Sequence, residues 1–212
     1  MGMGFTIIDR SKWPREEYFR YFLRAVPCMY SMTVQLDVTP IMRQHARPYP
    51  AMLYFLSVVE NRHKEYRIAF NEQGELGYYD VVHPSYTVFH RDDHTFSSLW
   101  TEYNEDYHIF LNSYEQDTAI YGNNRGLFGK PGRPANLFPV SVIPWIAYES
   151  LHLSFPRAFR YFIPMYTLGR LHRKRSRYYM PLALEVHHAV CDGYDAGAII
   201  KEIQSLINGW KG

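Results

Sequence analysis

The stretch that decides the fold is HHAVCDG, residues 187–193, near the end of a chain of 212 residues. It follows residues 178–187, an apolar run typical of a mostly buried β-strand. Neighbouring residues at the end of a strand point to opposite faces, so the two histidines can have different functions. Asp192 is placed to cap a following helix, because a carboxylate there accepts free backbone N–H groups. Gly193 permits the tight turn between strand and helix.

Helical and strand-like patterns alternate irregularly upstream of this stretch. The expected helices cover residues 14–26, 49–63, 104–118 and 193–208, the first with Tyr18, Phe19, Phe22 and Val26 on its apolar face. The expected strands cover residues 30–38, 86–90, 95–99, 137–147, 158–168 and 178–187, with a hairpin turn at 71–74 and a loop at 122–136. No glycine pattern for a dinucleotide or phosphate loop is present. The pattern predicts an α+β fold over a single domain, residues 1–212, in which helices pack on one face of a mostly antiparallel or mixed sheet in a two-layer sandwich.

Composition excludes several classes of protein. A formal net charge of +2 gives no field that would favour nucleic acid or a membrane surface, and the apolar runs are shorter than the ~18 residues a membrane span needs. Cys28 and Cys191 match no zinc or redox spacing, so we expect reduced thiols and a cytoplasmic location. The other histidines show no metal-ligand spacing, and no metal is expected. Aromatic residues make up 17% of the chain, which suits the core and subunit contacts more than a ligand pocket.

A basic run at residues 170–177 lies between two apolar stretches. It is best interpreted as a solvated hairpin turn. The alternative is a small anion site, for example for a phosphorylated cofactor.

The paired histidines carry the candidate chemistry. A histidine near neutrality can take a proton from an alcohol, provided that a neighbour fixes its tautomer. Taken alone, however, such a pattern is more often a capped turn whose histidines are only hydrogen-bonded.

Several segments resemble the chloramphenicol acetyltransferase family. HHAVCDGY at 187–194 closely matches the family signature, although the shorter pattern HHxxxDG is also found in dihydrolipoamide acyltransferases and peptide-synthetase condensation domains. SVIPW at 141–145 is similar to the family's S-x-x-P-W segment. Residues 15–28 and 87–97 are similar to two further family segments, so the resemblance runs from about residue 5 to 208.

The resemblance implies a mechanism. His188 would be the general base that deprotonates an acceptor hydroxyl, which then attacks the thioester of acetyl-CoA directly, with no acetyl-enzyme and no tightly bound cofactor. Ser141 would donate a hydrogen bond to the oxyanion. Asp192 would form a buried ion pair with Arg15 that tethers the first helix to the catalytic turn.

The resemblance also implies a homotrimer with active sites between subunits. One subunit would supply Tyr21, Phe22, Val26 and Cys28 to the acceptor pocket, and another would supply His188, Ser141 and Thr167. Further apolar wall would come from Phe96, Phe128, Leu153 and Met165. Arg47 would bind the 3′-phosphate of CoA or, equally well, be a solvated surface charge.

Two departures from the family concern the acceptor. Phe22 stands where drug-acetylating relatives usually carry tyrosine, and Asp195 where they commonly carry histidine. Three hypotheses therefore stay open: acetylation of the primary hydroxyl of chloramphenicol, the same transfer to another small amphipathic alcohol, and a trimeric binding protein without turnover.

Overall fold

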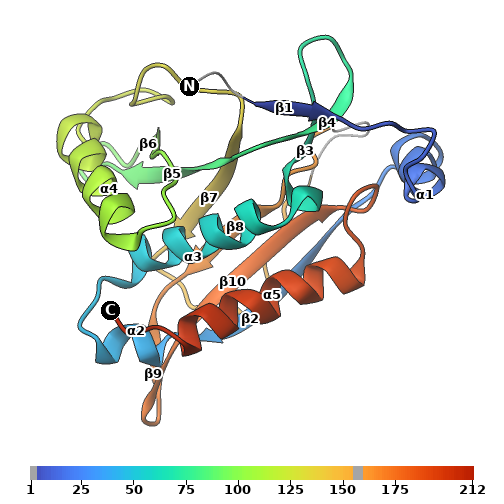
Figure 1. Ribbon diagram of the computed structural model, residues 1–212. Helices are drawn as coiled ribbons and strands as arrows, with labels where there is room; N and C mark the ends of the chain where they lie inside the picture. Colours follow the sequence, from blue (N-terminus) through green and yellow to red (C-terminus); the bar gives the residue numbers. More distant parts are fainter. Residues whose placement is uncertain (1–3, 155–159) are drawn as a thin grey trace.

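The computed structural model describes residues 4–154 and 160–212, and a mixed seven-stranded sheet dominates it (Figure 1). The strand order is β2-β10-β8-β7-β5-β6, with β9 paired to β10. The strands are β2 (Met29–Asp37), β10 (Arg177–His187), β8 (Met165–Gly169), β7 (Leu137–Ile143), β5 (His83–Phe89), β6 (Phe96–Trp100) and β9 (His172–Lys174). β7 runs parallel to both of its neighbours, and the other pairs are antiparallel. The predicted mixed sheet is confirmed.

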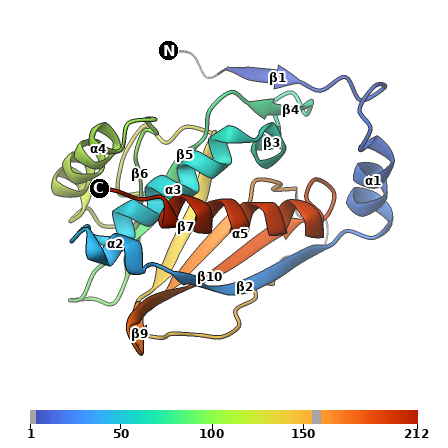
Figure 2. The ribbon, with the colours of Figure 1, turned by 60° about the horizontal axis from the view of Figure 1, so that its bottom comes forward.

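The long helices cover one face of this sheet. α3 (Pro48–Arg62) and α5 (Gly193–Asn208) lie side by side on it, with α2 (Thr39–Arg43) next to them (Figure 2). α4 (Tyr107–Tyr121) packs against α3 and β6, whereas α1 (Glu16–Arg20) lies at the opposite end of the sheet in both views. A small second sheet contains β1 (Phe5–Ile7), β4 (Leu76–Tyr79) and β3 (Ile68–Phe70). This arrangement confirms the predicted α+β fold with helices on one face. No described helix is long and apolar enough to cross a membrane.

The core lies between the sheet and its two long helices. α3 is covered on nearly every side, which matches its apolar residues on all faces. On α5 the buried residues Ile199, Ile203 and Ile207 recur at helical spacing and form one apolar face. One buried polar pair crosses this layer, because the hydroxyl of Tyr166 donates to Oε1 of Glu60 at 2.5 Å. Burial raises the pKa of Glu60 well above its ordinary value, which favours the neutral form of its carboxyl group.

Several expectations needed correction. The first helix continues into a π-helical turn at Tyr21–Ala25, which changes the phase of its faces. Of its predicted apolar face only Phe19 is fully buried, whereas Tyr18 is 60% and Val26 44% exposed. The short elements β1, α2 and β9 carry too few residues for a periodic pattern and were missed. Part of the strand expected at 158–168 lies outside the described residues, and β8 begins only at Met165.

The basic run forms a hairpin turn between β9 and β10. Arg175 has a φ of 56°, a left-handed conformation that suits a tight turn. Arg177 pairs with Asp37 at 2.9 Å across to β2. The favoured interpretation of this run, a turn between two strands, is confirmed.

The tyrosine of the segment after β7 is built into the sheet. The hydroxyl of Tyr148 donates to the carbonyl of Thr167 and accepts the N–H of Ala183 at 3.2 Å. Thr167 and Ala183 are register partners, so this hydroxyl stands between β8 and β10. Gly169 leaves room for the ring, because a Cβ there would lie 2.9 Å from Tyr148 Cε1. The segment after β7 is therefore fixed to the face of the sheet that α3 and α5 leave open.

Candidate active site

The turn between β10 and α5 is closed by local hydrogen bonds. The N–H groups of Val190 and Cys191 both donate to the carbonyl of His187 at 3.1 Å. Asp192 caps α5, as predicted, because its Oδ1 accepts the N–H of Tyr194 at 2.9 Å and that of the next residue. These hydrogen bonds therefore fix the backbone of the turn that carries the paired histidines.

The two histidines have different surroundings, as their alternation predicted. His187 is 2% exposed, and its Nδ1 accepts the N–H of Ala189 at 3.1 Å. A neutral His187 ring therefore carries its proton on Nε2. His188 is partly exposed, and its ring stacks on Phe22 with centroids 3.9 Å apart and planes 14° apart. Only the second histidine is available to a ligand.

Contacts from two other elements hold His188. Its N–H donates to the carbonyl of Cys28 at 3.0 Å, and Tyr30 contacts the ring edge-on at 5.4 Å. Tyr30 was missed from the sequence, where it was only the first residue of an expected strand. Nδ1 of His188 is buried without a hydrogen-bond partner among the residues that the structure describes. Nε2 is therefore the nitrogen that can face an acceptor hydroxyl, but the neighbour expected to fix the tautomer of this ring is not found among the described residues.

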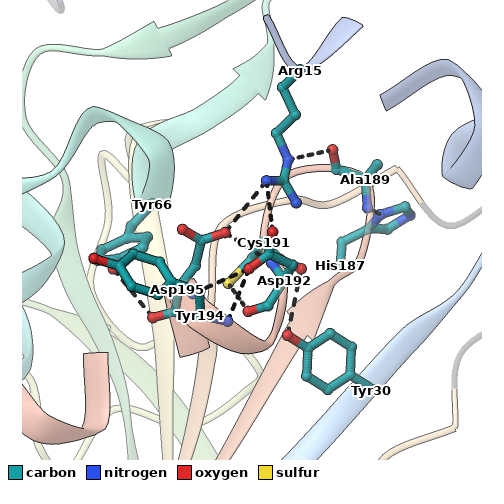
Figure 3. A network of polar contacts seen from close by, with 9 residues as sticks. All are labelled: Arg15, Tyr30, Tyr66, His187, Ala189, Cys191, Asp192, Tyr194 and Asp195. Atoms are coloured by element: carbon teal, nitrogen blue, oxygen red, sulfur yellow. Dashed lines mark hydrogen bonds and ion pairs between the residues drawn. The ribbon is translucent and has the colours of Figure 1, made fainter. Parts of the chain in front are cut away.

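An arginine from the start of the chain fastens the turn (Figure 3). Nη1 of Arg15 lies 3.2 Å from Oδ2 of Asp192, and Nε donates to the carbonyl of Ala189 at 3.2 Å. The predicted ion pair is therefore present, but the expectation that it is buried was wrong, since the Asp192 side chain is 44% exposed. Burial raises the pKa of Asp192, but the N–H of Tyr194 and the Arg15 guanidinium outweigh this and leave the pKa below its ordinary value. Such an exposed pair contributes about 0.2–1 kcal/mol, less than a buried one.

Asp195 contacts the same arginine and the same turn. Its Oδ2 accepts the N–H of Asp192 at 2.8 Å and lies 3.5 Å from Nη1 of Arg15. The sequence raised this residue as a change affecting the acceptor. The structure instead bonds its carboxylate to the backbone and to the arginine of the catalytic turn.

Ser141 lies far from His188 of the same chain. It is on β7, where it is the register partner of Thr167, and Thr167 is in turn the partner of Ala183 on β10. Ala183 precedes His188 by five residues, about 16 Å along the strand direction, and two strand spacings add about 10 Å across the sheet. The two predicted catalytic residues are therefore separated by roughly 19 Å within one chain.

The predicted pocket residues accordingly form two groups. The His188 group contains Tyr21 and Phe22 of the π-helical turn, Val26 at the end of that turn and Cys28 directly before β2. The Ser141 group contains Thr167 and Met165 on β8, Phe96 on β6 and Phe128 beside β6. The expectation that His188 comes from the same subunit as Ser141 and Thr167, and opposite Phe22 and Cys28, was therefore wrong. A histidine that stacks on Phe22 and is bonded to Cys28 belongs to their side of the site.

Both groups are open at the surface. Tyr21 is 53% exposed in the first group, and in the second Phe96 is 51% and Phe128 57% exposed. Leu153, 38% exposed, lies over β10, because its N–H donates to Oε1 of the buried Glu185 at 3.1 Å. Neither group forms a closed pocket within the described part of one chain.

Arg47 precedes α3 and is 59% exposed as a side chain. Its guanidinium pairs with Glu115 of α4. Among residues 4–154 and 160–212, no cluster of three His, Cys, Asp or Glu side chains could hold a metal ion.

Comparisons with known proteins identify the family and the fold of the chain. The model of the chloramphenicol acetyltransferase family matches residues 3–204. A chloramphenicol acetyltransferase of Clostridium perfringens is 48% identical over 206 residues, which cover 97% of this chain and 100% of that protein. One from Clostridioides difficile is 48% identical over 205 residues, 97% of each chain. A solved structure of a chloramphenicol acetyltransferase superposes with a TM-score of 0.81 at 19% identity, covering 96% of this chain and 100% of that one, and so shares the fold.

Proposed function

Because the chain belongs to the chloramphenicol acetyltransferase family, we propose that it transfers the acetyl group of acetyl-CoA to the primary hydroxyl of chloramphenicol. The observation that carries the proposal is His188, whose ring is held by Phe22 and whose Nδ1 is buried, leaving Nε2 for the acceptor. Relatives that are 48% identical over nearly the whole chain, each named as a chloramphenicol acetyltransferase, favour this acceptor over another amphipathic alcohol.

The chemistry proceeds in one complex of both substrates. Nε2 of His188 accepts the proton of the primary hydroxyl as its oxygen bonds to the thioester carbonyl carbon. Ser141 of the second group donates a hydrogen bond to the oxyanion that forms. The carbon–sulfur bond then breaks, the thiolate of CoA leaves, and the imidazolium returns the proton to it. No acetyl group is attached to the protein.

The complete site requires two copies of the chain. A donor to the oxyanion must lie about 3 Å from it, whereas Ser141 and His188 are roughly 19 Å apart in one chain. Both groups carry exposed aromatic side chains, which a second copy would cover. A cyclic trimer meets both needs, with Phe22, Cys28 and His188 of one subunit facing Ser141 and Thr167 of the next. Tyr21, Val26, Phe96, Phe128, Leu153 and Met165 complete the acceptor pocket.

The binding of the acetyl donor and the cellular location of the protein follow from the same proposal. Arg47 binds the 3′-phosphate of CoA, exchanging its surface pair with Glu115 for the phosphate. The whole of residues 1–212 acts as one acyltransferase domain. The protein works in the cytoplasm, where acetyl-CoA is available and where Cys28 and Cys191 stay free thiols.

Release of CoA tests the proposed reaction. Purified protein, acetyl-CoA and a thiol-detecting dye should show CoA release that depends on chloramphenicol. A derivative whose primary hydroxyl is replaced by hydrogen should release none. His188→Ala should lose at least about 10²-fold in kcat. His108→Ala, which changes an exposed histidine on α4, should leave kcat unchanged.

Two results would overturn the proposal. Equal CoA release with and without chloramphenicol would remove the drug as the acceptor, and a panel of amphipathic alcohols would then identify another. Full chloramphenicol resistance in cells that express the His188→Ala variant would instead indicate a binding protein without turnover.

A further inference from the structure

Two carboxylates, Asp192 and Asp195, share the arginine that fastens the catalytic turn. Oδ2 of Asp192 and Oδ2 of Asp195 lie 3.2 and 3.5 Å from the same Nη1 of Arg15 (Figure 3). Nε of this arginine donates to the carbonyl of Ala189, only one residue after His188. Arg15 therefore bonds to the turn both next to its histidine and next to its helix.

Asp195 also holds the backbone of the turn directly. Its Oδ2 accepts the N–H of Asp192 at 2.8 Å, and Oδ1 of Asp192 accepts the N–H of Asp195 at 3.4 Å. This reciprocal pair is a capping box, which satisfies two N–H groups that the first turn of a helix leaves without partners. In addition, the hydroxyl of Tyr66 donates to the carbonyl of Asp195 at 3.3 Å. The backbone of Asp195 is thus held by Tyr66, and the side chain of Asp195 holds the backbone of Asp192.

The surroundings of the Asp195 carboxylate disfavour its negative charge. The Asp195 side chain is only 20% exposed and lies beside a second carboxylate. Burial and the charge of Asp192 both raise the pKa of Asp195, and the N–H of Asp192 and the charge of Arg15 only partly oppose them. An amide or a hydroxyl could cap the helix without this repulsion. The side chain nevertheless makes two contacts here, with the N–H of Asp192 and with Nη1 of Arg15.

We propose that Asp195 is a positioning residue for the acetyl transfer, because its carboxylate holds the Asp192 N–H and shares the Arg15 guanidinium, and so fixes the turn that carries His188. This inference rests on the proposed role of His188 as the base. The two ends of the turn are fixed separately, at His188 by the Cys28 carbonyl and at Asp192 by Asp195. Release of the second end lets the imidazole move relative to the acceptor, and a displacement of about 1 Å can cost up to 10²-fold in rate.

Three variants separate positioning from simple capping. Asp195→Ala removes both side-chain contacts, whereas Asp195→Asn keeps an oxygen that can accept the Asp192 N–H. Asp106→Ala is the matched control, since Asp106 caps α4 by accepting the N–H groups of His108 and Ile109 at 2.8 and 3.1 Å. It removes a side-chain acceptor of helix N–H groups at the start of α4, which lies at the other end of the sheet (Figure 2).

Steady-state kinetics at a temperature well below unfolding give the first measurement. Asp195→Ala should lower kcat about tenfold and leave the KM of both substrates within about twofold, because substrate binding is not touched. Asp195→Asn should recover kcat to within about threefold of the wild type, since the shorter of the two contacts is kept. Asp106→Ala should lower the melting temperature and leave kcat unchanged. An Asp195→Ala variant with wild-type kcat and a melting temperature lowered as in Asp106→Ala would overturn the proposal.

Amide hydrogen exchange gives a second measurement that does not depend on the acceptor. The amides of Val190 and Cys191, both bonded to the carbonyl of His187, should exchange at least about tenfold faster in Asp195→Ala. Asp106→Ala should leave them unchanged. Unchanged exchange in Asp195→Ala would show that the turn does not need this carboxylate, whatever the kinetics. A wild-type protein that does not acetylate chloramphenicol would contradict the proposed function, and the exchange rates would still decide whether Asp195 holds the turn.

Discussion

Mixing two inactive variants tests whether the active site is divided between copies of the chain. One variant, His188→Ala, keeps an intact Ser141, and the other, Ser141→Ala, keeps an intact His188. The two residues lie roughly 19 Å apart in one chain, too far to act on one tetrahedral carbon. In a mixed oligomer, an intact His188 from one copy can instead meet an intact Ser141 from the next.

The expected recovery follows from the arithmetic of a cyclic trimer. With equal amounts of both variants assembled at random, half of the copies carry an intact His188 and half carry an intact Ser141. About one quarter of the interfaces then combine both intact residues. Each variant alone should lose about 10²-fold or more in kcat. The unfractionated mixture should therefore regain about a quarter of the wild-type activity. Mixed trimers purified through both tags should regain about a third, because one interface of their three combines both intact residues.

The assay requires that the two variants assemble together. They can be co-expressed with different affinity tags, purified through both tags in turn, and measured by CoA release. A matched mixture of His188→Ala with itself, carrying the same two tags, controls for the effect of the tags. Activity in the mixed oligomers no higher than the mean of the parents would refute the division of the site. It would place both residues in one chain and make the strand register described above wrong.

Three other substitutions test the structure elsewhere. The first, Glu60→Gln, removes a carboxyl group whose pKa is raised in the folded protein. The stability that this carboxyl group provides is fully present below its ordinary pKa of 4.5 and is lost as the pH rises through the folded pKa. The wild type should therefore lose up to about 1.4 kcal/mol per pH unit relative to Glu60→Gln across that window in urea unfolding, and a constant difference would contradict the burial of this carboxyl. Tyr148→Phe should lower the free energy of unfolding by about 1–2 kcal/mol, because two backbone groups lose their bridge, whereas Tyr18→Phe at an exposed site should not. Arg47→Ala should raise the KM of acetyl-CoA about two- to fivefold and leave that of its 3′-dephospho analogue unchanged, and equal rises for both would remove Arg47 from the phosphate site.

Local patterns were sufficient for the elements around the paired histidines. The apolar run before them is strand β10, Asp192 caps α5, and the all-round apolar segment is the buried helix α3. These features depend on residues within a few positions of one another, where periodicity, caps and turn residues act directly. The irregular alternation of helical and strand-like patterns predicted the α+β fold, and the family resemblance added acetyl transfer; both agree with the comparisons.

Local patterns failed where contacts join distant parts of the chain. The wrong subunit assignment of His188 arose because a motif names residues without fixing the strand order and register that separate Ser141 from His188. Asp195 was taken for a change at the acceptor, because its contact with Arg15 spans the length of the chain. The insertion of Tyr148 between β8 and β10 has no counterpart in any sequence pattern.

The amino-acid sequence by itself thus determined the strand, turn and helix that carry His188, because their formation depends on neighbouring residues. Only the tertiary structure decided which side chains accompany that histidine. Phe22 and Cys28 lie beside it because the first helix and β2 pack next to the end of β10, whereas Ser141 is carried two strands away. Distances of this kind are set by the pairing of strands remote in sequence, and no short stretch of residues contains that information.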